Sequence, residues 1–160
     1  MTTLRRVALV SASLSCSVLL ASRSLPPDFP DGYRRWTHVS TAIVGPENQQ
    51  MMSEQGIHHI YANDRAVEGL RGGRFPDGAA LVYDLLATRT ENGVTRSGER
   101  RRLDMMVKDS ARYGDTGGWG FESFAGGDRN APRVGDRAAT MCYGCHASRT
   151  STGVFSVFRE

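Results

Sequence analysis

Ala79-Ala80-Leu81-Val82-Tyr83-Asp84-Leu85-Leu86-Ala87 is the stretch that decides the fold of this 160-residue chain. It is almost entirely apolar, and the Pro76-Asp77-Gly78 sequence just before it is typical of a turn that precedes a strand. Because side chains alternate between the two faces of a strand, Tyr83 shares a face with Leu81, and Asp84 lies on the other. The stretch predicts a buried β-strand with the Tyr83 ring directed into the core or a ligand pocket.

Further strands are expected on both sides of this stretch, because the sequence there is rich in β-branched or aromatic residues or alternates apolar with polar ones. They are residues 37–44, 57–62, 102–108, 119–124 and a short 154–158. Short helices are expected at 63–70, after an Asn63-Asp64 N-cap, and from about Ala138. The predicted fold class is therefore mainly β (α+β): an antiparallel sheet of five or six strands with a few short helices. On length, residues 25–160 form a single domain.

Cys142-Tyr143-Gly144-Cys145-His146 is a C-x-x-C-H motif on the expected C-terminal helix. Cysteines three residues apart present both sulfurs on one helical face, and His146 follows directly. This motif predicts one covalently attached haem c, with Cys142 and Cys145 as thioether residues and His146 as the axial iron ligand. A structural zinc site normally needs a second pair of ligands, and a redox C-x-x-C pair needs no following histidine.

Residues 1–24 have the pattern of a secretory signal peptide, with cleavage after residue 21 or 24. Arg5 and Arg6 precede an uncharged, mostly apolar run that ends in small residues. The run is shorter than the roughly 20 apolar residues of a membrane-spanning helix, although an N-terminal membrane anchor is the alternative. We therefore expect an exported, periplasmic protein whose mature form lacks Cys16.

The charge of the mature chain points to no nucleic-acid partner. The whole chain has a formal net charge of +3, so removal of Arg5 and Arg6 leaves +1, and removal of Arg23 as well leaves zero. A chain with a net charge near zero lacks the excess positive charge that attracts a polyanion such as a nucleic acid.

Six short motifs, in their order, resemble the cytochrome P-460 family, which includes the cytochromes c-prime-beta. They are Tyr33-Arg34-Arg35-Trp36, Ile60-Tyr61-Ala62-Asn63, Phe75-Pro76-Asp77-Gly78, Val107-Lys108-Asp109, Gly118-Trp119-Gly120-Phe121 and the late C-x-x-C-H. The resemblance extends from about Asp31 to Phe158. It implies an antiparallel β-domain, usually a homodimer, with a five-coordinate haem c whose open side binds or redox-transforms nitric oxide or hydroxylamine.

The resemblance also bears on Tyr83. Hydroxylamine-oxidising members of the family carry a lysine, cross-linked to the porphyrin, in the strand after the Phe-x-Asp-Gly turn. That position, five residues after Gly78, is Tyr83 here, and the only lysine of the chain is Lys108. A lysyl cross-link is therefore not expected, which weakens the case for a hydroxylamine or nitric-oxide oxidoreductase.

Tyr83 and His59 are the candidate catalytic residues. Tyr83 is interpreted as a hydrogen-bond donor, a covalent link to the porphyrin, or core packing. His58 and His59 alternate across their strand, so one faces inward, as a distal haem residue or a hydrogen-bonded histidine.

Other residues near the expected site have ordinary structural interpretations beside the functional ones. Met105 is interpreted as core filling rather than a sixth iron ligand. Arg100, Arg101 and Arg102 are interpreted as a solvated strand edge rather than as contacts to haem propionates.

Two function classes follow from the sequence. The first is a small-ligand haem protein with an open iron position. The alternative is a six-coordinate periplasmic electron-transfer cytochrome that serves a redox partner protein.

Overall fold

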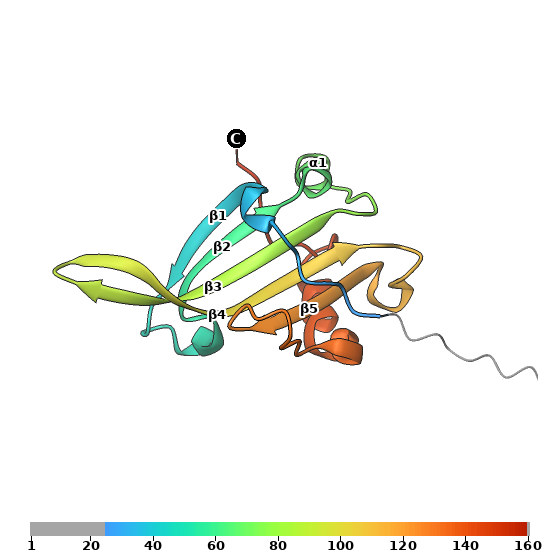
Figure 1. Cartoon of the computed structure of the whole chain (residues 1–160). Helices are drawn as coiled ribbons and strands as arrows, with labels where there is room; N and C mark the ends of the chain where they lie inside the picture. The colour runs from blue at the N-terminus through green and yellow to red at the C-terminus, as the bar shows by residue number, and fades with distance from the viewer. Residues whose placement is uncertain (1–24, 160) are drawn as a thin grey trace, which may run out of the picture.

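The computed structural model describes residues 25–159, which form an open five-stranded antiparallel sheet (Figure 1). The strands are β1 (Thr37–Val44), β2 (Gly56–Ala62), β3 (Ala80–Glu91), β4 (Val94–Lys108) and β5 (Trp119–Ala125). Their spatial order is β1-β2-β3-β4-β5, so each strand pairs with its neighbour in the sequence. The predicted fold class, mainly β with a few short helices, is confirmed.

The helices are short and lie before, between or after the strands. They are η1 (Tyr33–Arg35), η2 (Gln49–Glu54), α1 (Asp64–Gly72), η3 (Gly114–Thr116), η4 (Gly135–Arg137), the π-helical η5 (Ala139–Tyr143) and α2 (Gly144–Arg149). Helix α1 begins where predicted, because the Asn63 side chain accepts the Ala66 N–H as an N-cap. It ends at Gly72, and its C-cap is Gly73, whose left-handed φ of 71° suits a residue without a Cβ.

Strands β3 and β4 are longer than predicted and form a hairpin that projects from the body of the molecule (Figure 1). Its two-residue loop, Asn92 and Gly93, has φ values of 50° and 75°, as a type I′ turn requires. The outer residues of this hairpin are exposed. Its length therefore rests on backbone pairing, which leaves no burial pattern in the sequence.

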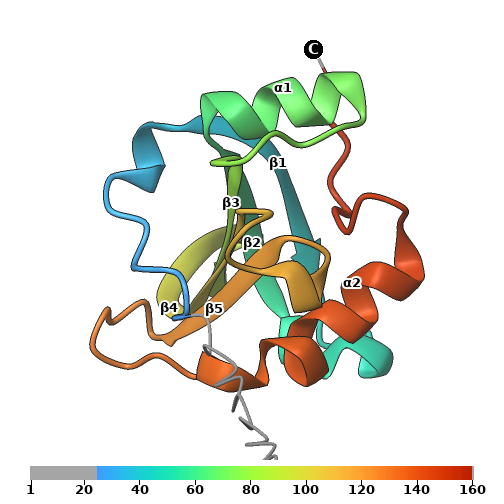
Figure 2. The same ribbon diagram turned by 90° about the vertical axis from the view of Figure 1, so that its right-hand side faces the viewer.

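Different parts of the chain cover the two faces of the sheet (Figure 2). The α2 face carries Leu81, Met106 and Phe121 and packs against α1 and the C-terminal segment, including Cys142 and Val154. The N-terminal face packs instead against the segment before β1. Its side chains and their partners are Val82, Leu103, Met105, Phe124, Phe29, Tyr33 and Trp36.

The predicted strand at residues 154–158 was wrong, because this segment has no regular secondary structure. Its apolar side chains are nevertheless used: Val154 and Phe158 pack on the α2 face. The apolar pattern of residues 154–158 therefore reflects burial of side chains and not a strand. The edge strands of the sheet are β1 and β5.

The predicted signal peptide, residues 1–24, lies outside the described residues. Within residues 25–159, no helix is long and apolar enough to cross a membrane.

Candidate haem-binding site

The C-x-x-C-H motif lies on one helical segment, with Cys142 in η5 and both Cys145 and His146 in α2. The residue that joins the two elements, Gly144, has right-handed helical angles, so the helical path continues through the motif. Cys142 is half-buried against the α2 face, whereas Cys145 is exposed, and both thiols are free. Two free thiols on adjacent positions of one helical face are what thioether attachment of a haem requires.

His146 is oriented by a backbone hydrogen bond. Its Nδ1 lies 2.7 Å from the Gly153 carbonyl oxygen. Because a carbonyl only accepts, Nδ1 carries the proton and the Nε2 lone pair is left for a metal. The rings of Phe121 and Phe155 flank the imidazole, with centroids 5.0 and 4.6 Å away. The His146 ring therefore has a fixed orientation, with Nε2 directed away from the Gly153 hydrogen bond.

Carboxylates near Cys142 complete the immediate surroundings of the motif. Burial, and then the charges of Asp104 and Glu122, raise the pKa of the Cys142 thiol to about 11. Asp104 also has one buried oxygen, Oδ1, without a hydrogen-bond partner among the described residues. Such an oxygen is costly unless a donor reaches it. The thiols, the oriented imidazole and this unused acceptor fit a bound haem c and a ligand that can donate a hydrogen bond.

Tyr83 lies on the α2 face, as the sequence predicted. It pairs across the sheet with Ile60 and Asp104, two residues from Leu81 in the α2-face core. The Tyr83 hydroxyl donates to Glu54 Oε2 at 2.6 Å. Burial and this hydrogen bond raise the pKa of Tyr83 well above its ordinary value. Tyr83 is therefore a neutral phenol whose proton is directed to a carboxylate.

His58 stacks on Tyr83, with ring centroids 4.6 Å apart, and its Nδ1 lies 3.2 Å from the phenol oxygen. Because the phenol proton is given to Glu54, the Nδ1–H of His58 donates to the Tyr83 oxygen. Burial lowers the pKa of His58, so a neutral ring with Nε2 as acceptor is favoured.

His59 is placed on the N-terminal face. Its Nδ1 lies 2.8 Å from the Thr41 hydroxyl, and its ring is near Tyr61. Of the two histidines, the structure brings His58 to the face that carries the motif.

Arg102 connects the polar side chains of this face. It donates to both carboxylate oxygens of Glu54, at 2.7 and 2.7 Å, and to Asp104 Oδ2 at 2.6 Å. Burial disfavours the Glu54 charge, but hydrogen bonds from Arg102 and Tyr83 outweigh it and lower the Glu54 pKa. We call Glu54, His58, Tyr83, Arg102 and Asp104 the polar cluster.

The interpretation of residues 100–102 as a solvated strand edge was wrong for two of the three. Strand β4 lies between β3 and β5. Arg102 therefore belongs to the polar cluster, and Arg100 binds the buried Asp84 on the N-terminal face at 2.6 Å. Only Arg101 is exposed, and it donates to the Gln55 carbonyl oxygen.

Two residues weighed in the sequence lie away from the polar cluster. Met105 is buried with Leu103 and Phe124 on the N-terminal face, which confirms core filling. Lys108 Nζ donates to the Gly117 carbonyl oxygen at 2.7 Å and lies over the Trp119 ring.

A helix with two free thiols and an oriented histidine, packed on an antiparallel sheet, defines a c-type cytochrome built on a β-domain. The family model for Cytochrome P460 matches residues 30–156. The chain therefore belongs to the Cytochrome P460 family and is an iron-binding haem c cytochrome. A search of curated protein sequences returned no similar protein.

Proposed function

We propose that this cytochrome is an exported monohaem protein that binds or redox-transforms nitric oxide, hydroxylamine or a similar small nitrogen ligand at an open iron position. The observation that carries the proposal is the polar cluster on the α2 face. Two of its members, Tyr83 and Asp104, lie next to one another across β3 and β4. The cluster is also linked to the motif, because the charge of Asp104 raises the pKa of the Cys142 thiol.

The haem iron, when bound through His146, supplies the coordination and redox chemistry. The chain supplies hydrogen-bonding groups around the ligand. Asp104 Oδ1 accepts from an N–H or O–H of the ligand, which suits hydroxylamine. His58 Nε2 is a second acceptor, and Tyr83 is held in place between His58 and Glu54.

We propose that Tyr83 acts through hydrogen bonds and that no lysine is cross-linked to the porphyrin. Lys108 is engaged with Gly117 and Trp119, which supports this view. The competing outcome is a covalent Tyr83–porphyrin bond. Mass spectrometry of a haem-bearing digest decides between them, because a cross-link joins the Tyr83 peptide to the peptide with Cys142 and Cys145. Such a joined peptide would favour an oxidoreductase over a ligand-binding cytochrome.

The ferric spectrum of the purified holoprotein tests the open iron position. We expect a high-spin spectrum that changes on addition of nitric oxide. A low-spin spectrum that nitric oxide leaves unchanged would instead support the six-coordinate electron-transfer cytochrome. Tyr83→Phe should alter the ligand-bound spectrum and leave haem content unchanged, with Tyr61→Phe, on the N-terminal face, as the matched control.

The location and partners of the protein are also proposals. Family membership and the signal-like residues 1–24 support export to the periplasm, a redox partner protein there, and a homodimer. Fractionation of cells that express the full chain tests export. Sedimentation of the holoprotein tests the dimer, and a monomer at micromolar concentration would contradict it.

A further inference from the structure

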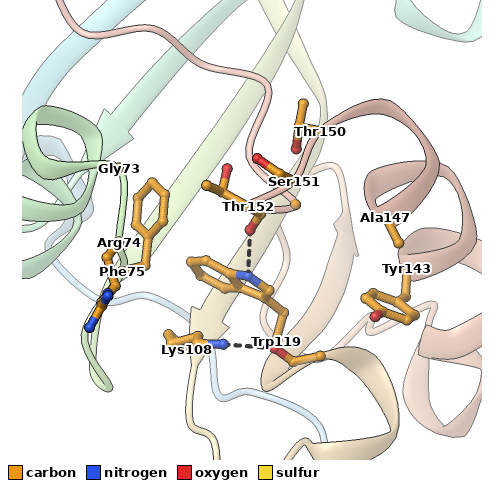
Figure 3. Close-up of a pocket in the computed structure, with 12 residues that line it drawn as sticks. Gly73, Arg74, Phe75, Lys108, Trp119, Tyr143, Ala147, Thr150, Ser151 and Thr152 are labelled. Atoms are coloured by element: carbon orange, nitrogen blue, oxygen red, sulfur yellow. Dashed lines mark hydrogen bonds between the residues drawn. The ribbon is translucent and has the colours of Figure 1, made fainter.

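A pocket of about 390 Å³ lies beside η5 and α2, the helical segment that carries the C-x-x-C-H motif (Figure 3). Tyr143 and Ala147, one helical turn apart, line one side of it, and none of Cys142, Cys145 and His146 lines it. Its other walls come from the segment after α1, the end of β4, the start of β5 and the turn after α2. This volume is within the range of small-molecule sites, which is about 300–1,000 Å³.

The charged side chains that line the pocket are both cationic. Its lining includes Arg74 and Lys108 but no Asp or Glu. Lys108 uses one of its three N–H groups on Gly117 and forms no ion pair with any residue of 25–159. The Tyr143 hydroxyl has no hydrogen bond within the same residues, and Thr150 Oγ1 is buried without a partner. Two unpaired hydroxyl groups beside the cationic Lys108 side chain favour an anion.

Aromatic rings form the apolar part of the pocket. Trp119 and Phe75 meet edge to face, with centroids 5.3 Å apart, and Tyr143 lies across from Trp119 in Figure 3. Aromatic walls prefer a planar ring, which can stack or meet them edge to face. A compact inorganic anion would leave these walls without contacts, so the lining favours an organic anion with a flat apolar body.

We propose that this pocket binds a planar aromatic monocarboxylate. Its carboxylate meets Lys108, with Tyr143 and Thr150 as further donors, and its ring lies among Trp119, Phe75 and Tyr143.

A hydrogen bond links a residue that lines this pocket to His146, the proposed iron ligand. Gly153, which lines it, accepts the Nδ1–H of His146 at 2.7 Å. Thr152, the preceding lining residue, accepts the Trp119 indole N–H at 3.0 Å. A ligand that moves the turn at 150–153 therefore changes the hydrogen bond on which the basicity of an iron-bound His146 depends. Binding should be seen from the haem, whichever ligand the iron itself takes.

Isothermal titration of the holoprotein with benzoate tests the site. We expect saturable binding that Lys108→Gln weakens about tenfold or more, the effect of losing a hydrogen bond to a charged group. Thr150→Val should weaken binding severalfold. Arg89→Gln, a charge change on the exposed hairpin, is the matched control and should leave binding unchanged. Acetate should bind more weakly than benzoate, because it lacks the ring.

Coupling to the haem is measured in the same samples. Benzoate at a concentration that just saturates the wild-type protein should shift its reduction potential, and should shift that of Lys108→Gln less. Absence of benzoate binding to the wild-type protein would overturn the proposal, as would equal weakening by Lys108→Gln and Arg89→Gln. Equal affinity for acetate and benzoate would overturn the aromatic part. None of these results depends on the nitrogen ligand proposed above, because the titration needs no ligand on the iron.

Discussion

Asp84 is a fully buried carboxylate on the N-terminal face of the sheet. It accepts hydrogen bonds from the Tyr33 hydroxyl at 2.6 Å and from Arg100 Nε at 2.6 Å, and Arg34 approaches at 3.3 Å. Burial alone would raise the pKa of Asp84, but its bonds to Arg100 and Tyr33 outweigh burial and lower it. The charge is therefore part of the folded structure.

Removal of this carboxylate should be strongly destabilising. Asp84→Ala leaves a largely buried guanidinium without its partner, and we expect the free energy of unfolding to fall by about 3–5 kcal/mol. Chemical denaturation measures this difference. Asp31→Ala, which breaks the exposed pair with Arg129, is the matched control and should cost less than about 1 kcal/mol.

The same lowered pKa predicts the direction of the pH dependence. Because the folded pKa is below the unfolded value near 3.8, the unfolded chain binds the proton first as pH falls. The stabilisation is complete above that value and is lost as pH falls below it through the folded pKa. Asp84→Asn should therefore reduce the slope of unfolding free energy against pH in the acid range. An unchanged slope would show that folding does not lower the pKa of Asp84.

His146 is the residue on which iron ligation depends. His146→Gly should leave the porphyrin tethered by Cys142 and Cys145 while the ferrous spectrum changes, because the proximal ligand is lost. Imidazole added to the variant should restore much of the wild-type spectrum. A variant with wild-type spectra would show that another residue ligates the iron.

Residue identities at the site could be predicted only in part. Cys142, Cys145 and His146 could be identified from the C-x-x-C-H motif alone. Strand alternation correctly placed Tyr83 on the same face as Leu81, which is the α2 face. Alternation could not choose between His58 and His59, because that choice depends on the register of β2 against β3. Glu54 precedes β2 in the short helix η2, so no strand or motif pattern marked it.

At the scale of single elements, α1 offers a matched pair of glycines. A Cβ on Gly69 would lie 2.2 Å from the Phe75 ring, whereas a Cβ on Gly72 would meet nothing within 4 Å. Gly69→Ala should therefore destabilise the protein by about 1–3 kcal/mol through overpacking, despite better helix propensity. Gly72→Ala should be neutral or stabilising by up to about 1 kcal/mol. Thermal unfolding of both variants measures the contrast, and similar effects would contradict the close packing of α1 on Phe75.

The positions of most elements followed from local sequence, and their lengths did so where one face is buried. Strand 37–44 was predicted with its observed bounds, because its β-branched residues end at Gly45-Pro46. Strand β4 begins at Val94, eight residues before the predicted start, because its outer half is polar and exposed. Only pairing with β3 holds that half in place.

At the scale of the whole molecule, the projecting hairpin can be shortened without disturbing the body. Deleting the facing pairs Arg89/Arg96 and Thr90/Thr95 keeps the turn and the register, because two residues are lost from each strand. Since these residues are exposed, we expect the unfolding free energy to change by less than about 1 kcal/mol. Sedimentation of the shortened protein shows whether the hairpin takes part in the proposed dimer. A large loss of stability in the monomer would contradict its independence from the core.

The meandering strand order has a consequence for the order in which the molecule is assembled. Every pairing joins strands that are consecutive in the chain, so the sheet forms through short loop closures and without waiting for the C-terminal segment. The thiols follow β5 and therefore reach a surface that the earlier strands already provide. The chain can thus acquire its architecture before its prosthetic group, and Cys142→Ala/Cys145→Ala should retain the β-sheet circular dichroism of the holoprotein. Maturation then becomes a late, separable event, in which attachment of the haem completes a scaffold that has already folded.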